Sequence, residues 1–98
     1  MNVNKIPQGE NLLVEIEGRL DTSTAPQLES ELADLTGVKK LTLDFAKLEY
    51  ISSAGLRVLL GTQKRMNAQG EMSIAHVNDT IMEVFEITGF SDILTIEK

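Results

Sequence analysis

Two adjacent serines, Ser52 and Ser53, are the residues whose position best suits chemistry. They separate the strand-like run LTLDF from the helix-like run LRVLLGTQKRM, and the small residues Ala54 and Gly55 follow them. A hydroxyl at such a point can cap a helix, which contributes about 1 kcal/mol. It is also sterically open to a modifying enzyme, and a phosphate there would meet free N–H groups at the positive end of the helix dipole. The residues alone leave both interpretations open.

Other catalytic arrangements are poorly supported. Ser53, His76 and an aspartate could form a nucleophilic set, but no G-x-S-x-G turn surrounds the serine. The seven glycines spell no phosphate-binding loop, and the acidic residues form neither a carboxylate pair nor a calcium loop. The absence of cysteine excludes thiolate catalysis and zinc–thiolate sites. We therefore expect no catalytic residue, no metal and no cofactor, so the chain is not expected to be an enzyme.

Composition limits the classes of partner. The 98 residues, 42% of them hydrophobic and 4% aromatic, predict one domain over residues 1–98 with an aliphatic core. A net charge of -6 disfavours binding to nucleic acids and to anionic membrane surfaces. The start of the chain does not resemble a secretory signal, and no apolar run approaches the roughly 20 residues of a membrane span. We expect a cytoplasmic protein without membrane insertion.

The elements that would position the serines follow from periodicity. Residues 11–18, 41–45 and, more weakly, 72–74 alternate between apolar and polar side chains, and short strands are also expected at 3–6 and 94–96. Such strands have one face that is more exposed to solvent, so helices should cover only the other face. Helices are predicted over 24–37, 54–69 and 79–89, each ending at or before a glycine. Thr24 is the predicted cap of the first, and Asn78 or Asp79 that of the third. The fold class is α/β, with a small mixed sheet of four to five strands and helices mainly on one face.

Three segments carry a resemblance to a known family. GRLDTSTAPQLESEL, LTLDFAKLEYISSAGLRVLLGTQK and FEITGFSDILTI resemble, in order and spacing, the STAS family and in particular bacterial anti-sigma factor antagonists. The resemblance spans almost the whole chain and implies a STAS-like fold and a partner-switching mechanism. The unphosphorylated protein would bind an anti-sigma factor that is also a serine protein kinase, which releases the sigma factor. Phosphorylation would end the binding, and a serine phosphatase would restore it.

The resemblance also implies which residues take part. The phosphate acceptor is expected to be Ser53, with Ser52 as the alternative. Family members often read D-S-S-G or D-S-T-G, whereas here Ser52 occupies the acidic position and Ala54 the last hydroxyl position. Asp21 matches the family's loop aspartate beside the acceptor, and its alternative role is that of a turn or capping residue. The expected partner-binding residues are Asp21, Thr22, Ser23, Ser52, Ser53, Ala54, Gly55 and Arg57.

Some alternatives remain open. Arg57 is predicted to be exposed by helical phase, and a solvated charge is the alternative to a partner contact. Met82 is either a small exposed apolar contact or a gap-filling core residue. A STAS subunit of a transport or scaffold assembly that is never phosphorylated is the alternative function. The free protein is expected to be a monomer.

Overall fold

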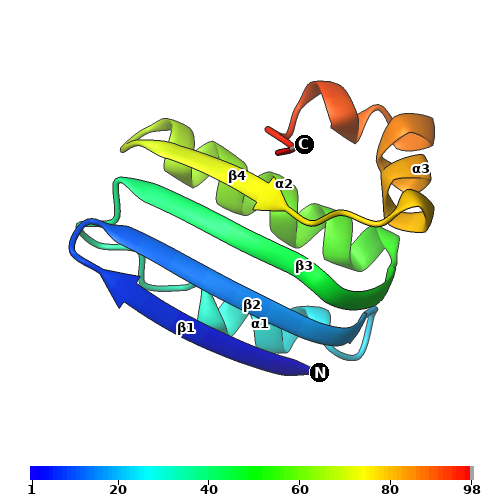
Figure 1. Cartoon of the computed structure of the whole chain (residues 1–98), viewed down its shortest axis with the longest axis horizontal. Helices are drawn as coiled ribbons and strands as arrows, with labels where there is room; N and C mark the ends of the chain where they lie inside the picture. The colour runs from blue at the N-terminus through cyan, green and yellow to red at the C-terminus, as the bar shows by residue number, and fades with distance from the viewer. Residues whose placement is uncertain (98) are drawn as a thin grey trace.

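The centre of the fold is a mixed sheet, which the computed structural model describes within residues 1–97. Its four strands lie side by side in chain order and are β1 (Asn2–Gln8), β2 (Asn11–Leu20), β3 (Lys40–Ile51) and β4 (Glu71–Ala75). β1 is antiparallel to β2, whereas β2, β3 and β4 are parallel to one another. In the tight turn between β1 and β2, Gly9 has a φ of +62°, which glycine adopts without a steric penalty. Figure 1 shows this order across the twisted sheet.

Two of the three α-helices cover one face of the sheet, whereas the third lies at the end of the sheet. The helices are α1 (Ala25–Glu31), α2 (Ser53–Asn67) and α3 (Asp79–Thr88), and a short 3-10 helix, η1 (Phe90–Asp92), follows α3. In Figure 1, α1 and α2 lie behind the sheet, whereas α3 lies beyond the end of β4. The predicted α/β fold with helices mainly on one face is confirmed.

The core forms between the sheet and side chains of α1, α2 and α3 because the strands alternate. Val14 and Ile16 of β2 are buried, while the intervening Glu15 and Glu17 are exposed. The other large side chains that are completely or almost completely buried include Leu28, Leu32, Leu41, Leu43, Phe45, Leu59, Met66 and Phe85. Burying one such side chain contributes about 1.5–3 kcal/mol. This aliphatic core holds the ends of β2, β3 and α2 in fixed relative positions.

α1 is shorter than the sequence predicted. It ends at Glu31 and does not continue toward Gly37. Leu32 is still fully buried, although it lies in the turn after α1. The apolar spacing that indicated a longer helix therefore reflects burial in this turn. The Arg65 guanidinium of α2 donates hydrogen bonds to the carbonyl oxygens of Leu32 and Ala33, at 2.9 and 2.8 Å. Because another helix satisfies these carbonyl groups, the chain can leave the helical path here.

β3 is longer than predicted. The alternation ends at Phe45, whereas the strand continues to Ile51. The pairing of β3 with β2 shifts register twice along the stretch from Glu15 to Arg19, which marks β-bulges or similar irregularities. These irregularities interrupt the period of two, so the second half of β3 carries no clear strand pattern in the sequence. β1 and β2 also extend beyond the predicted ranges, and α2 and α3 lie within two residues of theirs.

The predicted last strand, at residues 94–96, does not form. A single parallel bridge joins Ile96 to Ile74. The Ile74 N–H donates to the Thr95 carbonyl at 2.9 Å, and the Glu97 N–H donates to the Ile74 carbonyl at 2.8 Å. Before this segment, the chain enters η1 directly after Gly89, whose φ of +81° ends α3. The sheet therefore has four strands and one additional bridge at the β4 edge.

Candidate functional site

The carboxyl ends of β2 and β3 bring the aspartate loop and the serine pair to the same edge of the sheet. Leu20 and Ile51 are register partners at the ends of these parallel strands. The Ser52 N–H donates to the Leu20 carbonyl at 2.9 Å, which joins the two connections directly. Figure 1 shows the chain leaving both strands at this end, toward α1 and toward α2. Residues 21–24 and 52–54 therefore lie next to each other.

The two serines have different environments. Ser52 stands at the N-cap position of α2 in an extended conformation, and its side chain makes no capping hydrogen bond. The Ser52 Oγ is buried, and it has no hydrogen-bond partner within residues 1–97. Ser53 is the first residue of α2 and is exposed. The interpretation of the serine at the N-cap as a capping side chain is therefore wrong, and only Ser53 presents its side chain to solvent.

Gly55 allows α2 to begin this close to the sheet. It is buried, and a Cβ added to it would lie 2.7 Å from Leu20 Cγ and 3.0 Å from Ile51 Cγ1. Both distances are shorter than ordinary van der Waals contact, so any side chain here would push α2 away from the strand ends. The half-buried Ala54 precedes it. The small residues after Ser53 thus fix the position of the first turn of α2.

Asp21 organises the loop between β2 and α1. Its Oδ1 accepts hydrogen bonds from the Ser23 N–H at 3.0 Å, from the Ser23 hydroxyl at 2.7 Å and from the Thr24 N–H at 3.2 Å. The Ser23 hydroxyl has the largest effect and lowers the pKa of the Asp21 carboxyl, against a weaker opposing effect of desolvation. In this structure Asp21 takes the turn role that the sequence left open, with its Oδ2 facing Arg19.

Thr24 does not take the predicted capping role. It occupies the N-cap position of α1 without a side-chain capping bond. Its hydroxyl instead donates to the Arg19 carbonyl at 2.8 Å and accepts from the Asp21 N–H at 2.8 Å. Both bonds tie the loop back to the end of β2. These hydrogen bonds, within the loop and to the end of β2, therefore fix the conformation of the loop beside Ser53.

Sequence reasoning expected the turn from Glu49 to Ser53 at the contact surface but did not predict the pairing of Arg19 with Tyr50. They are register partners on β2 and β3, and the Arg19 guanidinium carbon lies 4.3 Å from the centroid of the Tyr50 ring. Arg19 Nε is also 3.8 Å from Asp21 Oδ2. Tyr50 is 41% exposed, so this cation–π pair is open to solvent. Their proximity follows from strand register, which the sequence does not display; the only signal was a lone tyrosine just before the serines.

Arg57 lies on the exposed side of α2, as the helical phase predicted. It lines a groove between α1 and α2 together with residues of both helices and of the aspartate loop. The lining residues are Thr22, Ala25, Pro26, Glu29, Ala54, Arg57 and Val58. The predicted partner-binding residues therefore lie around one edge of the molecule, with Ser23 and Ser53 exposed and Gly55 buried beneath them.

Neither a catalytic set nor a metal site is assembled from the described side chains. His76 Nδ1 lies 2.9 Å from Asp44 Oδ1. The Ser53 hydroxyl makes no hydrogen bond to a histidine within residues 1–97, so the nucleophilic set considered above is not assembled. In the same part of the chain, no cluster of three potential metal-ligating side chains occurs.

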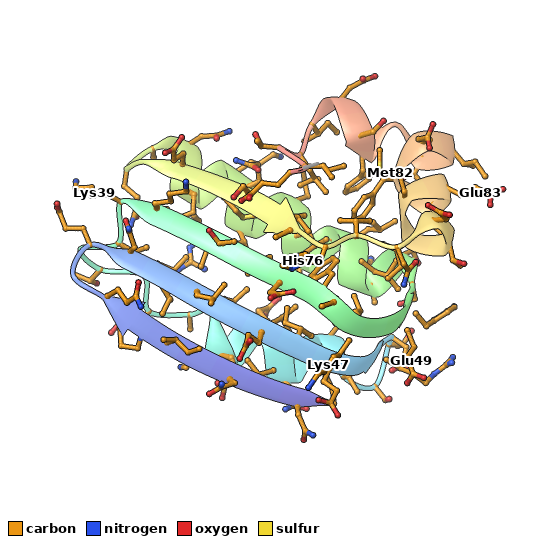
Figure 2. All side chains as sticks on the ribbon, viewed as in Figure 1. Lys39, Lys47, Glu49, His76, Met82 and Glu83 are labelled. Carbon is orange, nitrogen blue, oxygen red and sulfur yellow. The ribbon has the colours of Figure 1, made fainter. Side chains whose placement is uncertain are left out.

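In Figure 2, Met82 lies on α3, whereas Lys47 and Glu49 lie in the second half of β3, toward its carboxyl end. Met82 is half-buried and packs against the core, which favours its interpretation as a gap-filling residue. Among residues 1–97, no helix has the length and apolarity needed to span a bilayer.

Comparisons with known proteins give consistent matches. The model of the STAS domain family matches residues 2–98. A Bordetella bronchiseptica protein, provisionally named anti-sigma factor antagonist BtrV, is 40% identical over 88 residues, which cover 87% of this chain and 76% of the relative. The anti-sigma-B factor antagonist of Staphylococcus aureus is 31% identical over 101 positions, covering 100% of this chain and 94% of the relative. A crystal structure from Thermotoga maritima, provisionally named an anti-sigma factor antagonist, superposes with a TM-score of 0.90 at 18% identity, covering 98% of this chain and 86% of that one.

Proposed function

The chain belongs to the STAS domain family, and we propose that it is an anti-sigma factor antagonist switched off by phosphorylation of Ser53. In its unphosphorylated form it binds an anti-sigma factor that is a serine protein kinase, and the sigma factor is released. The proposal is supported by the names of the two relatives described above: one is an anti-sigma-B factor antagonist, and the other is provisionally named an anti-sigma factor antagonist. The protein itself performs no chemistry in this proposal: it is the substrate of the kinase and of a serine phosphatase, in the cytoplasm.

The observation that carries the proposal is the contrast between the two serines. Ser53 is exposed on the first turn of α2, whereas the Ser52 Oγ is buried. A kinase must bring the acceptor oxygen into line with the γ-phosphorus of a nucleotide, which requires an accessible hydroxyl. This contrast supports Ser53 over Ser52 as the acceptor. The small neighbours of Ser53 leave space for the approaching active site.

The transfer step in this proposal is an in-line displacement at phosphorus. Ser53 Oγ forms a bond to the γ-phosphorus of ATP while the bond from that phosphorus to the bridging oxygen of ADP breaks. ADP leaves, and the hydroxyl proton passes to a base of the kinase. The phosphatase reverses the change by hydrolysing the phosphate ester with water.

The effect on binding comes from charge at a rigid site. At neutral pH the phosphate adds about -1.5 to -2 charges to an already acidic protein. A partner surface that covers Ser53 would have to desolvate this charge, and a mismatch of about 3–4 kcal/mol lowers affinity by two to three decades. The first turn of α2 tolerates an anion, because negative charge is favourable at a helix N-terminus. The switch therefore needs no change of fold.

The proposal is tested by incubating the protein with the cognate anti-sigma factor kinase and ATP, followed by intact mass and peptide mapping. We expect one added phosphate at Ser53, its loss in Ser53→Ala, and its retention in the matched control Ser52→Ala. Phosphorylation of Ser53→Ala to the wild-type extent would exclude Ser53 as the acceptor. Recovery of a transport ATPase in place of a kinase in a pulldown would favour a transport assembly instead.

A further inference from the structure

Arg57 is the arginine near the proposed acceptor whose charge is not engaged. Arg65 donates to two backbone carbonyl groups near the end of α1, and Arg19 stacks on Tyr50 and faces Asp21. Within residues 1–97, the Arg57 guanidinium makes neither an ion pair nor a hydrogen bond. A cation without a partner at this position is available to a new negative charge.

Helix geometry places this cation beside Ser53. The two residues are four positions apart within α2, and both are exposed, so they lie on the same face, one turn apart. Residues at this spacing have Cβ atoms about 5–6 Å apart, well within the reach of an arginine side chain. The order also fits, since a negative group N-terminal to a positive one is the more favourable arrangement.

The surroundings leave Arg57 free to reorient. It lines the groove described above and a second hollow beside it that also involves Gly61 and Arg65 of α2, and Glu29 of α1 lines both. No ion pair of 4.0 Å or less joins Arg57 to Glu29 in the described part of the chain. In the adjoining segment from the end of β2 into the aspartate loop, Asp21 would repel a phosphate, and Arg19 is already engaged. Arg57 is thus the cation best placed to respond.

We infer that Arg57 is the internal counter-ion of phosphoserine at position 53. This inference rests on the proposed function, because it concerns the modified state of the same site. Before modification, the guanidinium faces solvent or the partner. After modification, it turns to the phosphate through charge-assisted hydrogen bonds, which arginine forms in bidentate geometry. Phosphorylation therefore removes two groups that the partner could contact, the free Ser53 hydroxyl and the uncompensated charge of Arg57.

The test uses phosphoserine incorporated at position 53 during translation, so it needs no kinase. The second pKa of the phosphate is measured by phosphorus NMR titration in the wild-type background and in Arg57→Gln, Arg57→Lys and Lys64→Gln. Lys64 is an exposed cation on the same helix, eleven positions from Ser53, and serves as the control. We expect the phosphate pKa to be higher in Arg57→Gln by about 0.15–0.4 units, from the usual strength of such pairs.

Two further results sharpen the test. Lys64→Gln and Arg57→Lys should leave the phosphate pKa close to the wild-type value, and 1 M salt should reduce the effect of Arg57→Gln. An identical phosphate pKa in the wild-type background and in Arg57→Gln would overturn the inference. The proposed function is judged separately, by whether the same phosphoserine protein loses affinity for the kinase, so either idea can fail alone.

Discussion

Replacing Gly55 by alanine tests how α2 is held against the sheet. The added Cβ would lie 2.7 Å from Leu20 Cγ, and Leu20 is fully buried. Overpacking of this kind costs about 1–3 kcal/mol. The better helix propensity of alanine returns about 0.5–1 kcal/mol. We expect a net loss of about 1 kcal/mol, and at most about 2.5 kcal/mol, in the free energy of unfolding.

Gly61→Ala is the matched control, because Gly61 also lies within α2. Within residues 1–97, a Cβ added there would meet no atom within 4 Å other than those of its chain neighbours and the adjacent backbone of α2, and the residue is exposed. The same chemical change should therefore stabilise the protein by about 0.5–1 kcal/mol, through helix propensity alone. The two variants are predicted to differ in sign although they replace the same residue type in one helix.

Urea unfolding followed by circular dichroism measures both variants, and thermal unfolding checks them. A loss of 1 kcal/mol lowers the melting temperature of a domain of this size by about 4–8 °C. Gly55→Ala should also be phosphorylated more slowly, because displacement of the first turn of α2 moves Ser53. Equal stabilities of Gly55→Ala and Gly61→Ala would refute the reasoning that close packing at Gly55 positions the site.

Three further predictions concern the scaffold. Arg65→Ala should lower the free energy of unfolding by about 1.5–3 kcal/mol, because two carbonyl groups lose a charged donor, and an unchanged urea midpoint would contradict this role. Asn78→Ala should cost about 1 kcal/mol, since the Asn78 side chain accepts from the Ile81 N–H at 2.8 Å, whereas Asn78→Asp should retain most of the stability. Burial opposes ionisation of Asp44, but hydrogen bonds from a backbone N–H and from His76 outweigh it and lower the pKa of its carboxyl below 3.8. Its stabilising effect is therefore present above about pH 4 and is lost as the pH falls through the folded-state pKa, so Asp44→Asn should show a smaller loss of stability between pH 6 and pH 3.

The parts of the fold that could be predicted are those in which local pattern and burial agree. The alternation around Val14 and Leu43 predicted two central strands with one wet face, and both residues are buried against the helices. Gly89 ends α3 and Asn78 caps it, as their residue types indicated. Each of these features depends on residues close together in the chain.

The parts that could not be predicted depend on distant segments. α1 ends early, where Arg65 of another helix supplies donors to the following carbonyl groups. The Arg19–Tyr50 pair depends on the register between β2 and β3, which shifts twice along the paired strands. The difference between Ser52 and Ser53 likewise depends on how tightly α2 packs on the strand ends through Gly55. The sequence indicated the serine pair as a candidate site but not which hydroxyl faces solvent.

The most direct test of the central claim compares the affinity of the anti-sigma factor kinase for the unmodified protein and for the protein carrying phosphoserine at position 53. Isothermal titration calorimetry at constant salt and nucleotide concentration would give both dissociation constants. The charge switch predicts a loss of affinity of about 100- to 1000-fold, with the melting temperature of the free protein nearly unchanged. Equal affinities of the two forms would contradict the account, as would a phosphate that weakens binding only by unfolding α2.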